Sequence, residues 1–132
     1  MESQLVMREA PDLGRLRKAK LSEIPRMAIV AAAGFFHSEV LKYQRPLYAK
    51  FAADTVKNFY NFFLREIRNP NSIVLVVEDS FEKDERDWVY DALKDIYPSM
   101  ENADSVIVGV GIMSLPKGSN RSGQFQPEGK CY

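Results

Sequence analysis

The sequence contains very few of the residues that form covalent cross-links, bind metals or transfer protons. Its 132 residues include one cysteine, Cys131, and one histidine, His37. A single cysteine excludes a disulfide within the chain and is typical of proteins kept in a reducing compartment. No cluster of cysteine, histidine and carboxylate residues has the spacing of a zinc site, and no pattern of serine, histidine and aspartate indicates a hydrolase. We therefore expect a cytoplasmic protein without a metal centre.

Neither charge nor hydropathy points to nucleic acid or a membrane as a partner. Eighteen basic and eighteen acidic residues cancel, so no excess charge attracts the chain to nucleic acid or to anionic lipid. The longest apolar run, residues 27–36, is about half as long as a membrane-spanning helix, and the first residues lack the apolar core of a secretory signal. The hydrophobic content of 45% and the charged content of 27% are those of a globular domain.

The first patterned segments predict a short strand followed by a buried helix. Residues 15–21 alternate weakly, as in a strand with two different faces. Ser22 is placed to cap the next helix, and Pro25 falls in its first turn, where a missing N–H costs nothing. Residues 24–36 contain a single charge, Arg26, so we expect this helix to be largely buried.

A second helix and a strong strand follow. The segment 37–45 is predicted to be irregular, and the helix after it runs to Arg68, with its main part capped by Asp54. Its apolar stripe consists of Ala52, Val56, Phe59, Phe63 and Ile67. Residues 73–77, with the sequence IVLVV, are apolar without interruption, which predicts a strand covered on both faces.

Residues 81–104 form a charged insertion before the last strand. An apolar stripe that includes Trp88 and Leu93 predicts one helix, which Pro98 ends. The acidic run at 82–87 is expected to be the solvated start of that helix, because carboxylates are favourable near a helix N-terminus.

The last predicted strand, residues 106–115, carries two glycines that resemble part of a nucleotide-binding loop. A dinucleotide site needs a third glycine where the loop enters a helix, and here both the glycine and the helix are missing. Gly109 and Gly111 therefore indicate a buried strand with two small residues.

Together these segments predict an α+β fold in the order strand, helix, helix, strand, helix, strand. The last two strands are expected to pair antiparallel, with the helices packed on the sheet as a second layer. The folded domain should span 15–116, between a flexible N-terminus at 1–14 and a disordered tail at 117–132.

Four stretches follow one another along the chain as LRKAKLSEIPRM, AAAGFFHSEVLKY, SIVLVVED and VIVGVGIMSLP. In this order they resemble the opening strand, the first helix with its following loop, the second strand and the third strand of the GNAT N-acetyltransferase superfamily, in particular a fungal-type subgroup. The resemblance covers roughly residues 16–126. It implies an incomplete GNAT-like fold with a mixed, mostly antiparallel sheet.

The resemblance also implies an activity. Family members transfer an acetyl group directly from acetyl-CoA to an amine on a small molecule or a protein. They hold the coenzyme with a fourth strand and with a Q/R-x-x-G-x-G/A loop, whose amides open the next helix. Gly118, Gly123 and Gly129 do not have this spacing. We therefore expect no cofactor-binding residues here, a chain truncated before the acetyl-CoA motif, and weak activity or none.

Four side chains lie where the resemblance places contacts to the acceptor: Phe36, His37, Tyr43 and Tyr48. Each also has a simpler interpretation, because aromatic residues at a helix end commonly serve packing. His37 could act as a base or could be an ordinary loop histidine. The base and the acid of the family belong to later elements, so the catalytic residues are unknown.

An alternative function is non-catalytic. Without a fourth strand, the strand at 106–115 would leave one row of amides and carbonyls unpaired along an apolar segment. Such an edge favours pairing with a second copy or another chain, or aggregation. The chain would then act as a half-domain through association.

Overall fold

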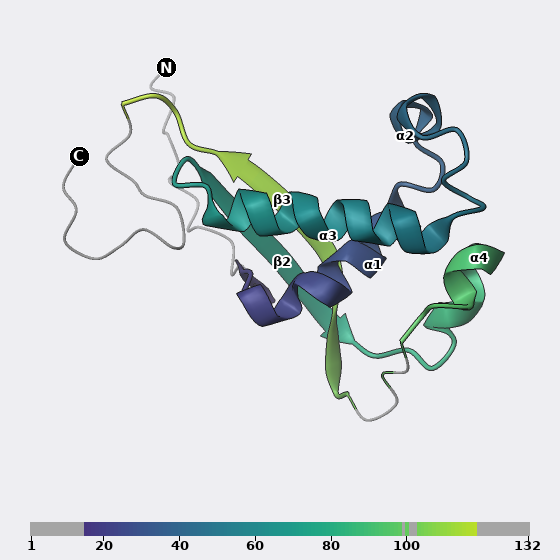
Figure 1. Cartoon of the computed structure of the whole chain (residues 1–132). Helices are drawn as coiled ribbons and strands as arrows, with labels where there is room; N and C mark the ends of the chain where they lie inside the picture. The colour runs from purple at the N-terminus through teal and green to yellow at the C-terminus, as the bar shows by residue number, and fades with distance from the viewer. Residues whose placement is uncertain (1–14, 99, 101–102, 119–132) are drawn as a thin grey trace, which may run out of the picture.

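The structure is a computed structural model that describes residues 15–98, 100 and 103–118. Within these residues it contains a small sheet, two longer helices and several short helical segments (Figure 1). In chain order the elements are β1 Leu16–Lys18, a 3₁₀ turn Leu21–Glu23, α1 Ile24–Gly34, α2 Glu39–Gln44, α3 Ala52–Arg68, β2 Ser72–Ser80, a 3₁₀ turn Glu85–Trp88, α4 Asp91–Lys94 and β3 Ser105–Ser114.

The strands form one antiparallel sheet in the order β1-β2-β3, with β2 in the centre. This confirms the predicted antiparallel pairing of the last two strands. A β-bulge interrupts that pairing, because Val77 opposes Gly109 whereas the next residue of β2 opposes Ile107. Val108 is therefore the extra residue on β3, and the strand bends there.

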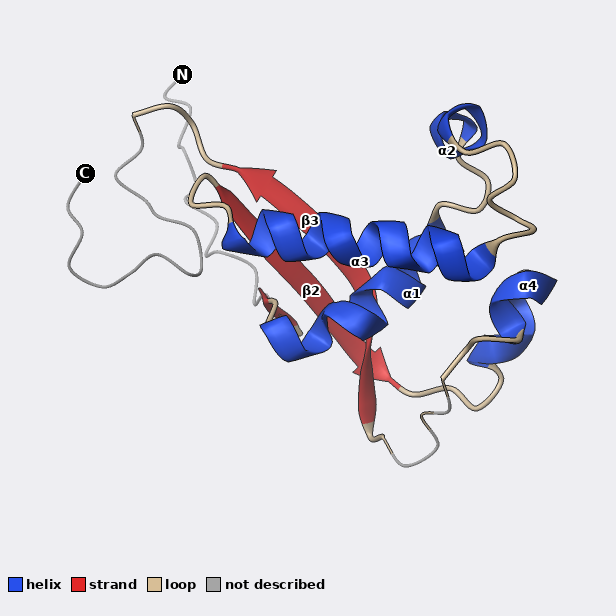
Figure 2. Ribbon diagram, in the orientation of Figure 1, coloured by secondary structure: helices blue, strands red, loops and turns tan. Residues whose placement is uncertain are grey.

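Helices α1 and α3 cover one face of the sheet and form the core with it (Figure 2). The main cluster consists of Ala19, Ile24, Met27, Ala31, Phe63, Ile67, Val74, Val76 and Ile107. A fully buried isoleucine or methionine side chain contributes roughly 1.5–3 kcal/mol, so this layer stabilises the fold. The predicted α+β layer architecture is confirmed.

The opposite face of the sheet is only partly covered by the described residues. Ile73 and Leu75 are half-buried, Val77 is 38% exposed and Met113 is 53% exposed. The prediction that residues 73–77 are covered on both faces is therefore wrong within the part of the chain that the structure describes. An antiparallel sheet needs only one packed face, and an apolar run does not distinguish the two cases.

Helix α1 starts at Ile24 as predicted, but it is not capped as predicted and it ends two residues before Phe36. Ser22 lies inside the first 3₁₀ turn and does not cap α1. The carboxylate of Glu23 instead accepts a hydrogen bond from the backbone amide of Lys20 at 2.8 Å. This bond satisfies the backbone donor just before the 3₁₀ turn. Pro25 lies in the first turn of α1 as predicted, and the helix ends at Gly34.

The segment after α1 is more regular than predicted. The hydroxyl of Ser38 caps α2 by accepting a hydrogen bond from the amide of Leu41 at 3.3 Å, and the side chain of Leu41 is buried. The predicted irregular segment 37–45 therefore contains a short helix. α3 starts before Asp54, which lies in its first turn and does not cap it, and ends at Arg68 as predicted.

The insertion 81–104 does not form the single predicted helix. Its described residues fold into the second 3₁₀ turn and α4, separated by Val89 and Tyr90. Leu93 is fully buried in a second small core, whereas Trp88 is 82% exposed. The apolar stripe therefore correctly identified Leu93 as a core residue, but the segment forms two short helical pieces and not one helix.

Some predictions concern residues that the structure does not describe. The predicted flexible N-terminus at 1–14 lies outside the described residues, and so do Cys131 and all of the tail except Lys117 and Gly118. Among the described residues, no helix is both long enough and apolar enough to cross a membrane.

Candidate functional site

An aromatic cluster lies where α1, the segment after α2 and the turn before α4 meet. Phe36 is at its centre, and its ring stacks on Tyr90 with the ring centroids 4.6 Å apart. The edge of His37 contacts the same ring at 4.8 Å, and Tyr48 does so at 5.7 Å. The structure therefore brings together three of the four predicted acceptor contacts and adds Tyr90.

Tyr48 is held firmly within this cluster. Its side chain is buried, and its hydroxyl donates a hydrogen bond to the carbonyl of Phe36. Its own carbonyl accepts a hydrogen bond from the hydroxyl of buried Thr55 at 3.3 Å. These bonds connect the segment after α2 to Phe36, just after α1, and to α3. Tyr48 therefore stabilises the packing of the cluster.

His37 and Tyr43 are placed differently from Tyr48. His37 is exposed and touches the cluster through the edge of its ring. Tyr43 lies on α2 and is 88% exposed, and among the described residues it takes no part in the ring contacts that join the other three. His37 can therefore meet a ligand at the rim of the cluster, whereas Tyr43 lies outside it.

Tyr90 is the residue of this cluster that the sequence pattern did not identify. Its hydroxyl is buried and has no hydrogen-bond partner among the described residues. Burial raises the pKa of Tyr90, and the nearby Tyr48 raises it further. The phenol is therefore neutral, with one proton to donate. No local pattern indicated this residue, because the insertion brings it to Phe36 from far along the chain.

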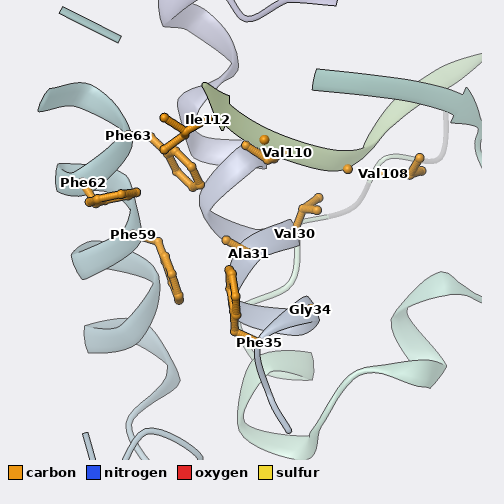
Figure 3. Close-up of a pocket in the computed structure, with 12 residues that line it drawn as sticks. Val30, Ala31, Gly34, Phe35, Phe59, Phe62, Phe63, Val108, Val110 and Ile112 are labelled. Carbon is orange, nitrogen blue, oxygen red and sulfur yellow. The ribbon is translucent and has the colours of Figure 1, made fainter. Parts of the chain in front are cut away.

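A separate apolar pocket lies between α1, α3 and β3 (Figure 3). Its volume is about 530 Å³. Phe35 from the end of α1 stacks on Phe59 of α3 at 5.7 Å, and Val110 and Ile112 of β3 line the side along the sheet edge. The side chains that line it are aliphatic or aromatic, so the pocket can hold an apolar group but offers no charged side chain to a phosphate.

The two glycines of the last strand lie within β3, as predicted, and not in a phosphate-binding loop. A Cβ atom on Gly109 would meet Val77 at 3.6 Å, whereas one on Gly111 would point into open space. The strand is less buried than predicted, because Val106 and Ile107 are buried but Ile112 is 37% exposed. Neither glycine opens a helix, so these residues do not fit the diphosphate of a nucleotide or of coenzyme A.

Arg26 joins the insertion to the bulge of β3. Its guanidinium donates to the carbonyl of Ile107 at 3.0 Å, to the carboxylate of Glu85 at 2.8 Å and to the hydroxyl of Tyr97 at 3.0 Å. Burial acts to lower the pKa of Arg26, but Glu85 and Tyr97 raise it on balance. Burial, together with the hydrogen bond to Glu85, raises the pKa of Tyr97. Glu85 is therefore not part of a fully solvated helix start, as predicted for 82–87.

The position of Arg26 carried a signal in the sequence. It is the one charge in an otherwise apolar helix, and a charge held against a core is paired almost without exception. The sequence could therefore predict that Arg26 has an acidic partner. It could not identify Glu85 as that partner, because 59 residues separate the two.

The fold and its surface features define an α+β domain whose sheet ends at β3 within the described residues. Comparison of the sequence with known proteins adds a relative: the chain is 31% identical, over 115 residues, to a protein from Stachybotrys chartarum described as an acetyltransferase. The similarity covers 87% of this chain but 41% of that protein, so the chain is related to part of an acetyltransferase. No protein-family model matches the chain, and no solved structure matches it either.

Proposed function

We propose that this chain is the acceptor-binding part of a GNAT-type N-acetyltransferase. The similarity to an acetyltransferase over 87% of the chain is the observation that carries the proposal. The order of strands and helices, which resembles the N-terminal half of that superfamily, supports it. Because the chain spans about two fifths of its relative, the complete reaction would need residues beyond those described.

In the proposed reaction acetyl-CoA supplies the acetyl group, and the acceptor supplies a neutral amine. The amine nitrogen would form a bond to the acetyl carbon, and the bond from that carbon to sulfur would break with its electrons staying on sulfur. Coenzyme A would leave as a thiolate that takes up a proton, and the proton on nitrogen would pass to a base. The cluster around Phe36 would pack against the apolar part of the acceptor, and the hydroxyl of Tyr90 would donate a hydrogen bond to it. An amine with an aromatic or aliphatic group is therefore the acceptor class that suits the site.

The described residues do not fit the diphosphate of the coenzyme, since both glycines of β3 lie in a strand. We therefore expect the purified chain to bind acetyl-CoA with a dissociation constant above about 1 mM in a calorimetric titration. A micromolar constant would show that the chain has a cofactor site of its own.

Acceptor binding is tested with 2-phenylethylamine as a probe, by following backbone amide signals in NMR spectra of the isotope-labelled chain. Shifts should concentrate at Phe36, His37 and Tyr90. The variant Tyr90→Phe should bind the probe about three- to tenfold more weakly, because it lacks the hydrogen bond. Shifts elsewhere in the chain, or equal binding by the variant, would contradict the proposed acceptor site.

A further inference from the structure

We propose that Arg26 is a positioning residue for the acceptor site, because it holds the loop 85–97 against α1 and so keeps the ring of Tyr90 on Phe36. This role rests on the proposed function, since Tyr90 and Phe36 belong to the acceptor site proposed above. The contacts that support it all join described residues in the interior of the domain.

The two ends of the loop 85–97 meet at the guanidinium of Arg26. This group donates to the carboxylate of Glu85 at 2.8 Å and to the hydroxyl of Tyr97 at 3.0 Å, and that hydroxyl in turn donates to Glu85 at 2.8 Å. The side chains of Arg26 and Glu85 are 12% and 18% exposed, so water competes little for these bonds. Hydrogen bonds between charged groups are roughly twice as strong as neutral ones, so the three-way contact closes the loop firmly.

The guanidinium is itself held by the core of the domain. Arg26 lies in the first turn of α1, and its side chain also donates to the carbonyl of Ile107 in β3 at 3.0 Å. Ile107 is buried in the main core. Both ends of the loop are therefore attached to a fixed point between the sheet and α1.

Between its ends the loop lies along α1. Leu93 of α4 packs with Ile29 and Ala32 of α1, and α4 is drawn beside that helix (Figure 1). Arg26 and Ile29 are three residues apart and so share one face of α1. The loop therefore contacts α1 at its first turn through Glu85 and at its middle through Leu93.

The tip of the loop reaches beyond the end of α1. Tyr90 stacks there on Phe36, with the ring centroids 4.6 Å apart. A hydrogen bond from Arg86 to the carbonyl of Lys94 at 3.0 Å joins the two short helical pieces on either side of Tyr90. A short surface segment whose ends lie close together and whose own side chains fill it is an Ω-loop, and such loops are frequently functional.

The place of Tyr90 depends on the rest of the loop, because its side chain has little else to hold it. The hydroxyl of Tyr90 is buried without a hydrogen-bond partner among the described residues, so ring contacts alone fix the side chain. If the two ends of the loop separate, Leu93 still anchors its middle, but the stack of Tyr90 on Phe36 loosens. Arg26 thus acts on the acceptor site through Tyr90, without touching the acceptor itself.

The ring contact can be measured in the purified chain without any ligand. Nuclear Overhauser effects between the ring protons of Phe36 and Tyr90 should be strong in the wild type and weak or absent in Arg26→Met. Arg17→Met is the matched control, because Arg17 is also paired with two carboxylates, Glu23 and Glu78, but contacts no residue of the loop. This variant should keep the ring contact, and circular dichroism must show that both variants are folded.

A milder variant tests the same contact if Arg26→Met does not fold. Tyr97→Phe keeps the ring of Tyr97 and removes only the hydroxyl that bonds Arg26 and Glu85. We expect it to weaken the effects between Phe36 and Tyr90 as well. Ring contacts of wild-type strength in Tyr97→Phe, and in Arg26→Met where that variant folds, would overturn the positioning role.

Binding of 2-phenylethylamine tests whether this role reaches the acceptor. Arg26→Met should raise the dissociation constant at least about threefold, whereas Arg17→Met should change it by less than about twofold. In a Tyr90→Phe background the hydroxyl that Arg26 positions is absent, so adding Arg26→Met should change the constant by less than about twofold. An equal factor in both backgrounds would show that Arg26 does not act through Tyr90.

The two measurements separate this role from the proposed function. If the wild type does not bind the probe while both loop variants lose the ring contact, the acceptor site is wrong and Arg26 still positions Tyr90. If the probe shifts Phe36 and Tyr90 while the ring contact survives in the variants, the acceptor site stands and the positioning role is overturned.

Discussion

The guanidinium of Arg26 lies 3.0 Å from the carbonyl oxygen of Ile107, and this contact connects α1 to β3 at the bulge. The same side chain reaches Glu85 in the insertion, so three segments that are distant in sequence meet at one cation. An arginine can do this because its guanidinium carries several donors in a rigid plane.

Replacing Arg26 should therefore affect both the core and the insertion. Arg26→Met keeps the length of the side chain but leaves the mostly buried Glu85 without its partner and the carbonyl of Ile107 without a donor. We expect the free energy of unfolding to fall by about 2 kcal/mol in urea denaturation. The control Lys57→Met, at an exposed position of α3, should change it by less than about 0.5 kcal/mol. Equal effects would show that the Arg26 contacts contribute little.

A second arginine makes the stability of the protein depend on pH. Hydrogen bonds from Arg17 hold the pKa values of Glu23 and Glu78 below their ordinary range. A carboxyl whose pKa is lower in the folded state stabilises the fold above its unfolded value of about 4.3, and this stabilisation is lost as the pH falls through the folded value. The free energy of unfolding should therefore decrease as the pH falls from about 6 through the lowered pKa values of the two carboxyls.

Arg17→Gln should flatten this pH profile, since neither carboxyl then has an arginine that favours its charged form. The variant should be less stable than the wild type at about pH 6, and the two should converge as the pH falls through the lowered pKa values of Glu23 and Glu78. Urea denaturation at several pH values measures both curves. Curves that run parallel over this range would assign the pH dependence to other groups.

The sequence predicted the helices and strands in which apolar residues recur at a regular spacing. It also predicted side chains of these elements that lie in the core. In α3 the stripe at helical spacing correctly identified Phe63 and Ile67 as core residues, because every turn of the helix presents the same face to the sheet. The apolar run of β2 predicted a strand, but not that Val77 would be left exposed. A run of apolar residues predicts a strand but does not show how many faces of that strand are packed.

The candidate site was less predictable because it depends on contacts between distant segments. Phe36 and Tyr48 were identified from a family resemblance, whereas Tyr90 reaches Phe36 only through the fold of the insertion. The pattern around Trp88 indicated one helix, yet the chain turns between its two short pieces and places Tyr90 there. No local periodicity contains that information, since the turn is stabilised by tertiary packing.

The insertion should depend on one anchoring side chain. Leu93 is fully buried and packs with Ile29 and Ala32 of α1, whereas Trp88 is larger but exposed. Leu93→Ala should lower the free energy of unfolding by about 2–4 kcal/mol, because it leaves a cavity in a packed cluster. Trp88→Ala should change it by less than about 0.5 kcal/mol. The opposite ranking in thermal or urea unfolding would mean that the tryptophan anchors the insertion.

The two tyrosines of the aromatic cluster differ in how their hydroxyls are bonded, and this difference predicts opposite effects on stability. Tyr48→Phe removes a hydroxyl that donates to the carbonyl of Phe36, so the free energy of unfolding should fall by about 1 kcal/mol. Tyr90→Phe removes a buried hydroxyl without a partner among the described residues, so stability should stay constant or rise by up to about 1 kcal/mol. Paired thermal melts of the two variants measure the difference. A loss of stability in Tyr90→Phe as large as in Tyr48→Phe would show that its hydroxyl is already bonded in the folded protein, and it would then not be available to an acceptor.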